Sequence, residues 1–219
     1  MRHFDQRLDD LQIRLLEMGG RVESAIQNSV GALVDRDEAR ARQVVASESD
    51  IDALDIEIDD LAVGLMALNQ PVARDMRFLA AAIKINSDLE RMGDLAAHIA
   101  ERALSLMQQP PVPLLDIPRL AQLAWTMAHD SLDALVRKDA ELAQRILLSG
   151  DAIDRLREGL FASLVGSMET DAAAVPSEIH LLFVVRYLER IADHATNIGE
   201  DVLYYLEGVD VRHRASLAR

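Results

Sequence analysis

The side chains of this chain that are best suited to chemistry are carboxylates spaced along one helix face. Seven of the thirteen positions in residues 48–60 are Asp or Glu. Four of these acids lie four, three and four positions apart and would share one helix face: Glu48, Asp52, Asp55 and Asp59. Like charges at this spacing destabilise a helix. Because residues 43–73 contain no Lys, Arg or His, we expect the counter-charge to come from another helix or from a bound cation.

A second set of carboxylates continues an apolar helix face. Apolar residues mark one side of the helix expected at 72–107, and Glu90 and Asp94 continue that side. The second half of the chain repeats the arrangement with Glu189 and Asp193. Burying an unpaired carboxylate costs free energy. These positions therefore predict pairing with a base, proton uptake or a bound metal.

Two interpretations of the acids stay open on the residues alone: they bind a metal, or they are solvated and paired with nearby bases. We favour a metal for the first half, where no base lies close in sequence to residues 48–59. In the second half, Asp154 and Glu158 form the matching row. Arg155 and Arg157 are interleaved with them and offer ordinary ion pairs.

The type of ligand atom limits the choice of metal. A site built from carboxylate oxygens is typical of Mg²⁺, Mn²⁺ or iron. Zinc would more often recruit histidine. His98 lies near Glu90 and Asp94 and is expected to help only at the edge of a site.

The elements that must hold these acids are helices. Residues 108–118, QQPPVPLLDIP, cannot form regular helix, because proline lacks the amide hydrogen and clashes with the preceding turn. Only 4% of the residues are aromatic and alternation of β-branched residues is scarce, so the chain is predicted to be all-α. We expect helices at residues 3–34, 38–68, 72–107, 118–137, 139–170 and 177–206.

An internal repeat relates the two halves of the chain. Leu89–Asp94 reads LERMGD and Leu188–Asp193 reads LERIAD, at an offset of 99 residues. The repeat predicts two tandem three-helix bundles made by duplication, with six long antiparallel helices. The bundles are expected at residues 1–109 and 118–219. Long bundles expose faces beyond their own core, and we expect a homodimer.

Composition and missing motifs exclude several classes of function. A net charge of −14 and a pI near 4.8 disfavour direct binding of nucleic acid. The sequence has no run of about eighteen apolar residues, so we expect no membrane insertion. It contains no Glu-x-x-His step, no phosphate-binding Gly-rich loop and no Gly-x-Ser-x-Gly elbow, so we do not expect an enzyme. A two-metal phosphohydrolase and a plain helical scaffold remain as alternatives.

The sequence resembles the PhoU family over nearly the whole chain. The resemblance rests on Gln70–Arg77, QPVARDMR, on the two Leu-Glu-Arg-x-x-Asp segments, and on the continuation of the second segment through Glu200. It implies two tandem three-helix bundles with Glu/Asp-x-x-x-Asp motifs that hold multinuclear metal clusters. In this sequence the motifs are Glu48 to Asp52, Asp55 to Asp59, Glu90 to Asp94 and Glu189 to Asp193; Asp151, Asp154 and Glu158 match more loosely.

The same resemblance implies a role in regulation. A PhoU-like protein would be a cytoplasmic, non-enzymatic adaptor. It would contact the ATPase subunit of the phosphate transporter and a membrane sensor histidine kinase. With phosphate plentiful, it would help to keep transport and the transcription of phosphate-starvation genes switched off, as a repressor of that response.

Overall fold

Six α-helices form the structure, a computed structural model that describes residues 2–211, with side chains from residue 4 onward. The helices are α1 (Arg2–Asp35), α2 (Glu38–Asn69), α3 (Ala73–Met107), α4 (Ile117–Arg137), α5 (Ala140–Thr170) and α6 (Val175–Glu207). Each lies within two residues of its expected bounds, and no strand occurs in the described part of the chain. The predicted all-α fold is confirmed.

The turn that precedes the second helix has the same form in each half of the chain. Asp37 caps α2 by accepting a hydrogen bond from the Arg40 amide at 3.0 Å. Asp139 caps α5 by accepting one from the Leu142 amide at 2.9 Å. Such caps satisfy backbone amides that a helix start leaves unpaired. Each cap follows a residue with left-handed backbone, so both hairpins turn in the same way.

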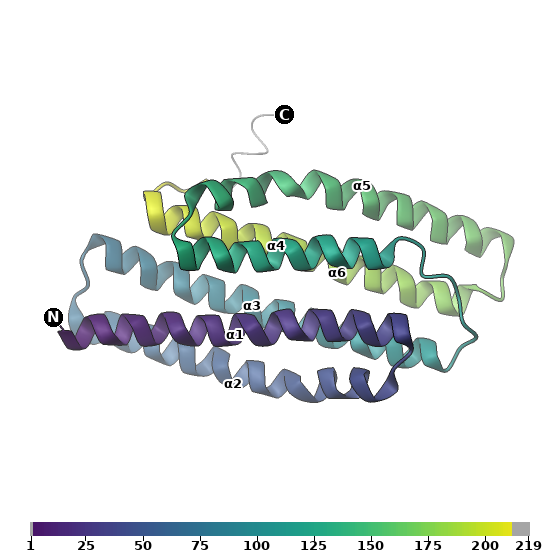
Figure 1. The fold of residues 1–219 in the computed structure, drawn as a ribbon, viewed down its shortest axis with the longest axis horizontal. Helices are drawn as coiled ribbons and strands as arrows, with labels where there is room; N and C mark the ends of the chain where they lie inside the picture. Colours follow the sequence, from purple (N-terminus) through teal and green to yellow (C-terminus); the bar gives the residue numbers. More distant parts are fainter. Residues whose placement is uncertain (1, 212–219) are drawn as a thin grey trace.

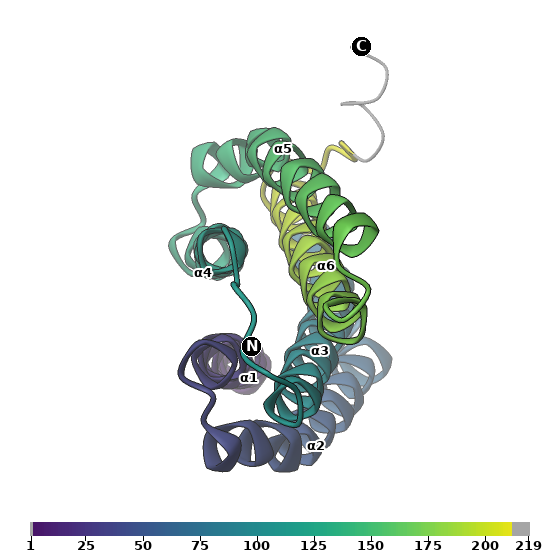
Figure 2. The same cartoon turned by 90° about the vertical axis from the view of Figure 1, so that its right-hand side faces the viewer.

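The helices form two packed three-helix units, α1–α3 and α4–α6, which lie side by side along their length (Figure 1). An end-on view shows α2, α3, α6 and α5 as a curved layer, with α1 and α4 on one side of it (Figure 2). Helices α3 and α6 pack against each other at the centre of this layer. The division into domains at 1–109 and 118–219 stays a prediction, and residues 212–219 lie outside the described part.

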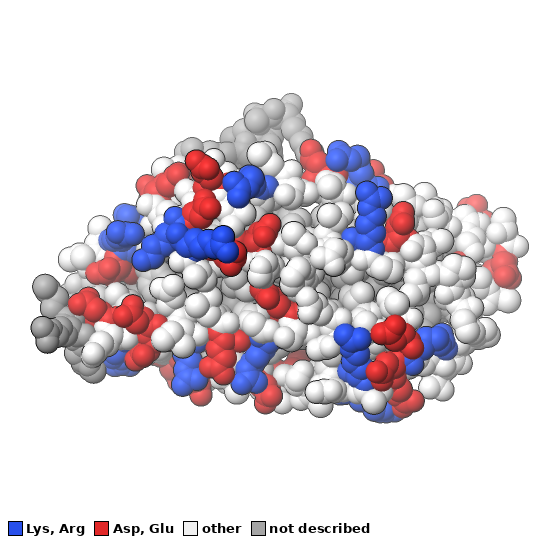
Figure 3. Space-filling model, viewed as in Figure 1, with Lys and Arg blue, Asp and Glu red and all other residues white. Residues whose placement is uncertain are grey.

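One continuous hydrophobic core runs through both halves. Its members come from all six helices, and the largest fully buried side chains include Leu15, Ile58, Ile85 and Met92. Between residues 2 and 211, none of the helices combines the length and apolarity needed to cross a bilayer. Arg and Lys are interspersed with Asp and Glu over the face formed by α1 and α4 (Figure 3).

Polar contacts join α3 to α6 across the middle of the molecule. Lys84 contacts Asp201 at 2.7 Å, and His194 Nδ1 lies 2.7 Å from Asp88 Oδ1. Both Asp201 and His194 are buried. These contacts fix α3 and α6 relative to each other, and therefore the acids that each helix carries.

Candidate metal centre

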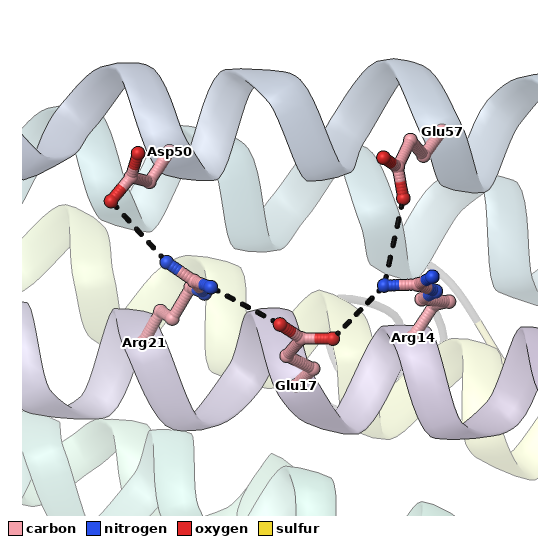
Figure 4. Close-up of polar contacts among 5 residues, drawn as sticks. All are labelled: Arg14, Glu17, Arg21, Asp50 and Glu57. Atoms are coloured by element: carbon pink, nitrogen blue, oxygen red, sulfur yellow. Dashed lines mark hydrogen bonds and ion pairs between the residues drawn. The ribbon is translucent and has the colours of Figure 1, made fainter.

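Helix α2 carries acids toward both of its neighbours, and those near α1 are paired. Arg21 contacts Asp50 at 3.3 Å and Arg14 contacts Glu57 at 3.6 Å, with Glu17 between the two arginines (Figure 4). All five side chains are well exposed. Exposed pairs of this kind contribute little stability. They do show that acids on this side of α2 are neutralised by the protein itself.

Acids on the other side of α2 meet acids of α3. Asp52, Glu90 and Asp94 each offer one carboxylate oxygen, and these three oxygens lie within 4.8 Å of one another. We call these three residues the α2–α3 acid cluster. Asp52 is exposed, whereas Glu90 and Asp94 are half-buried. Among the described residues, no other group of three or more potential ligand side chains is this close.

Close packing of α2 on α3 brings the cluster together. Gly93 precedes Asp94 and faces Ile51, which precedes Asp52; a Cβ at Gly93 would lie 2.9 Å from Ile51 Cδ1. Ile51 is buried in the core. The absence of a side chain at Gly93 therefore lets the two helices approach beside the acids.

The electrostatics of the cluster are unfavourable without a cation. Burial raises the pKa of Glu90 above its ordinary value, and Asp94, Asp55 and Asp52 raise it further. Burial and then Asp52 raise the pKa of Asp94. Within residues 4–211, neither Lys nor Arg forms an ion pair with any member of the cluster.

Glu48 lies at the edge of the cluster, with His98 nearby. Burial, and then Asp94 and Asp52, raise the pKa of Glu48. The positive charge of a protonated His98 would act in the opposite direction on Glu48 and Asp94. The exposed His98 ring stacks on Tyr187 of α6, with 5.4 Å between ring centroids. His98 is thus at the border of the site.

Asp55 and Asp59 are held by an amide. The Asn86 side chain donates hydrogen bonds to Asp55 Oδ1 at 2.7 Å and to Asp59 Oδ1 at 3.1 Å. Asn86 is fully buried, and its own Oδ1 has no hydrogen-bond partner among the described atoms. Sequence analysis missed this residue, although a polar Asn between Ile85 and Leu89 on an apolar helix face was an available signal.

The donor set suits a hard cation. Carboxylate oxygens are the preferred ligands of Mg²⁺ and Mn²⁺. Two oxygens on opposite sides of a Mg²⁺ ion lie about 4 Å apart. The oxygens of Asp52, Glu90 and Asp94 lie within 4.8 Å of one another, which is a separation on the same scale. Glu48 is the adjacent carboxylate that would extend the ligand set.

The acids predicted in the second half have different surroundings. Glu189 is contacted by Arg157 at 3.1 Å and by Arg186 at 2.9 Å, and Arg157 also contacts the exposed Glu158 at 3.3 Å. Asp193 is exposed as a residue, yet the surrounding protein and Glu189 raise the pKa of its carboxyl group. A metal at Asp154, Glu158, Glu189 and Asp193 stays a prediction.

A difference in sequence accompanies this difference in surroundings. Between α3 and α6 the offset is 99 residues, so Glu189 and Asp193 correspond to Glu90 and Asp94, and Asn197 takes the place of His98. Between α2 and α5, whose caps are Asp37 and Asp139, the offset is 102 residues, so Gly150 takes the place of Glu48. The second half therefore lacks one acid at the edge of its site and gains arginine neighbours.

Comparison with known proteins agrees with the repeat and with the fold. A family model described as "PhoU domain" matches residues 15–103 and again residues 117–202. The chain belongs to the PhoU family. It is 36% identical to the phosphate-specific transport system accessory protein PhoU of Edwardsiella tarda, over 96% of this chain and 87% of that protein. It is 33% identical to the protein of that name from Escherichia coli K12, over 96% and 88%.

Solved PhoU structures share the fold closely. The crystal structure of PhoU from Pseudomonas aeruginosa superposes with a TM-score of 0.91 at 34% identity, covering 94% of this chain and all of that one. The phosphate transport system regulatory protein PhoU from Streptococcus pneumoniae gives a TM-score of 0.87 at 29% identity, covering 95% and 99%. These relatives are named accessory or regulatory proteins rather than enzymes.

Proposed function

We propose that this protein is a metal-dependent, non-enzymatic regulator of phosphate uptake in the cytoplasm. It would link the ATPase subunit of a phosphate transporter to a membrane sensor histidine kinase and keep the starvation response off while phosphate is plentiful. Membership of the PhoU family and the names of its relatives support the role in phosphate transport. The adaptor role, the repression and the homodimer are our extension of it.

The α2–α3 acid cluster is the observation that carries the metal part of the proposal. Its three carboxylates lie together with raised pKa values for Glu90 and Asp94, and without a pairing Lys or Arg in the described chain. A bound Mg²⁺, Mn²⁺, iron or Zn²⁺ ion would offset most of the negative charge of these acids. It would therefore change the local potential on this part of an acidic surface. That change gives a partner protein a feature to recognise.

Partner capture tests the proposal. Immobilised protein is presented with the purified transporter ATPase subunit, and separately with the cytoplasmic part of the kinase, in Mn²⁺ and in EDTA. We expect capture of both partners in Mn²⁺ and at least tenfold weaker binding in EDTA. A tenfold change in the dissociation constant corresponds to about 1.4 kcal/mol of binding free energy. Asp52→Asn should reduce capture in Mn²⁺ to the EDTA level.

Glu57→Gln is the matched control for Asp52→Asn. Glu57 is an exposed acid of the same helix that contacts Arg14 instead of the cluster. This variant should capture both partners as the wild type does. Failure of the wild type to capture either partner, with or without metal, would reject the adaptor role.

A further inference from the structure

A groove between α5 and α6 exposes several large apolar side chains. It encloses about 360 Å³ and is lined by Phe161 of α5 and by Ile179, Leu182 and Phe183 of α6. Phe161, Ile179 and Phe183 are 51%, 43% and 45% exposed. Large apolar side chains that gather in a surface groove mark a binding site. We call this feature the α5–α6 groove.

Arginines border the α5–α6 groove on both helices. Arg157 of α5 and Arg186 of α6 both line it and both contact the one carboxylate of Glu189. Arg102 of α3 lies 5.8 Å from the centre of the Phe183 ring. Two guanidinium groups and the Glu189 carboxylate therefore line this apolar surface, and Arg102, which contacts Glu101 at 3.8 Å, lies beyond the lining. The chain as a whole has a net charge of −14. Arg186 is 65% exposed in its side chain and open to a further acidic partner.

Helix α3 carries different side chains at the positions that correspond to the α6 side of this groove. At the offset of 99 residues, Phe183 corresponds to Lys84 and Arg186 to Ser87, while Glu189 still corresponds to Glu90. Both halves share the helices and this acid, but the residues near the acid differ: Lys84 and Ser87 in the first half, Phe183 and Arg186 in the second. The two halves therefore present different chemistry at related positions.

We propose that the α5–α6 groove binds an amphipathic helix of a partner protein that carries acidic residues beside its apolar face. Apolar side chains of that helix would pack on Phe161 and Phe183. Its Asp or Glu side chains would lie beside Arg157 and Arg186, where opposite charge favours them. The inference rests on the proposed adaptor function, which requires a protein partner. The net charge of −14 opposes an anionic membrane as the occupant.

Two synthetic peptides test the proposal on the full chain. Both are fluorescein-labelled helices with leucine at positions i, i+4, i+7 and i+11, and they differ only in having Glu or Lys beside the leucines. Binding is measured by fluorescence anisotropy. We expect the Glu peptide to bind at least tenfold more tightly than the Lys peptide.

Variants locate the binding. Phe161→Ser removes an exposed apolar side chain of the groove and should weaken binding of the Glu peptide tenfold or more. Arg186→Gln should reduce the difference in affinity between the Glu peptide and the Lys peptide. Leu148→Ser is the matched control, because Leu148 is 80% exposed on the same helix but lies outside the groove. Ile179→Ser replaces Phe161→Ser if circular dichroism shows that the latter does not fold.

Three outcomes would overturn the proposal: equal binding of the two peptides, undiminished binding by Phe161→Ser, or absence of peptide binding. Conversion of a dimer into a monomer by Phe161→Ser, without peptide binding, would instead assign the groove to a second copy. If the wild type captures the transporter ATPase subunit but binds neither peptide, the groove proposal falls and the adaptor function stands. If peptide binding follows our expectation but no partner is captured, the adaptor function falls.

Discussion

Acids only two positions apart on α2, Asp50 and Asp52, have opposite surroundings. Asp50 and Glu57 lie beside arginines of α1, whereas Asp52 lies beside Glu90 and Asp94 of α3. The first pair is neutralised within the chain and the second set is not. A dense acidic stretch is therefore not one chemical feature, because each residue takes its role from the helix that it faces.

This difference predicts an unusual effect of pH on the metal-free protein. Since the fold raises the pKa of Glu90 above 4.5, the folded state holds that proton more tightly than the unfolded state does. Stability is then lost as pH rises from the unfolded pKa through the raised value. In EDTA at pH 7.5, Glu90→Gln should raise the free energy of unfolding by about 1 kcal/mol, since it removes several like-charge contacts. Near pH 4 the gain should disappear. Urea denaturation at both pH values measures it.

Glu57→Gln provides the comparison, because it removes an acid from an attractive pair with Arg14. It should leave the free energy of unfolding unchanged or slightly lower at pH 7.5. A Glu90→Gln variant no more stable than the wild type at pH 7.5 in EDTA would show that the acids do not repel each other as described.

At the scale of helices, sequence periodicity and proline positions were sufficient to predict all six elements. Helix starts such as Asp37 and Asp139 have caps that local sequence specifies. The partners of the acids could not be predicted in the same way. Neither the Asn86 hydrogen bonds to α2 nor the Arg157 contact with Glu189 follows from periodicity, because both depend on how helices rotate about their axes when packed.

Packing of α1 on α4 gives a test at this scale. A Cβ at Gly19 would lie 2.6 Å from Leu132 Cδ1 of α4, whereas nothing lies within 4 Å of one at Gly20. Gly19→Val should therefore lower the free energy of unfolding by about 1–3 kcal/mol relative to Gly20→Val, through overpacking of the contact between the halves. Thermal or urea denaturation of the two variants compares them directly. Equal stabilities would mean that Leu132 or the two helices can shift at no cost in free energy.

At the scale of the whole molecule, duplication has produced a symmetric scaffold with unequal surfaces. The first half joins acids of α2 and α3 without an ion-paired Lys or Arg among the described residues, and the second half surrounds Glu189 with arginines. The repeat predicted the scaffold but not this inequality. We therefore expect the first half to bind a metal ion more tightly than the second.

Titration of the metal-free protein with Mn²⁺, followed by calorimetry, tests the central claim most directly. The wild type should show a saturable tight site that Asp52→Asn abolishes, while Glu57→Gln and Glu189→Gln leave that site in place. Absence of saturable binding, or tight binding that survives Asp52→Asn, would contradict a metal centre at the α2–α3 acid cluster.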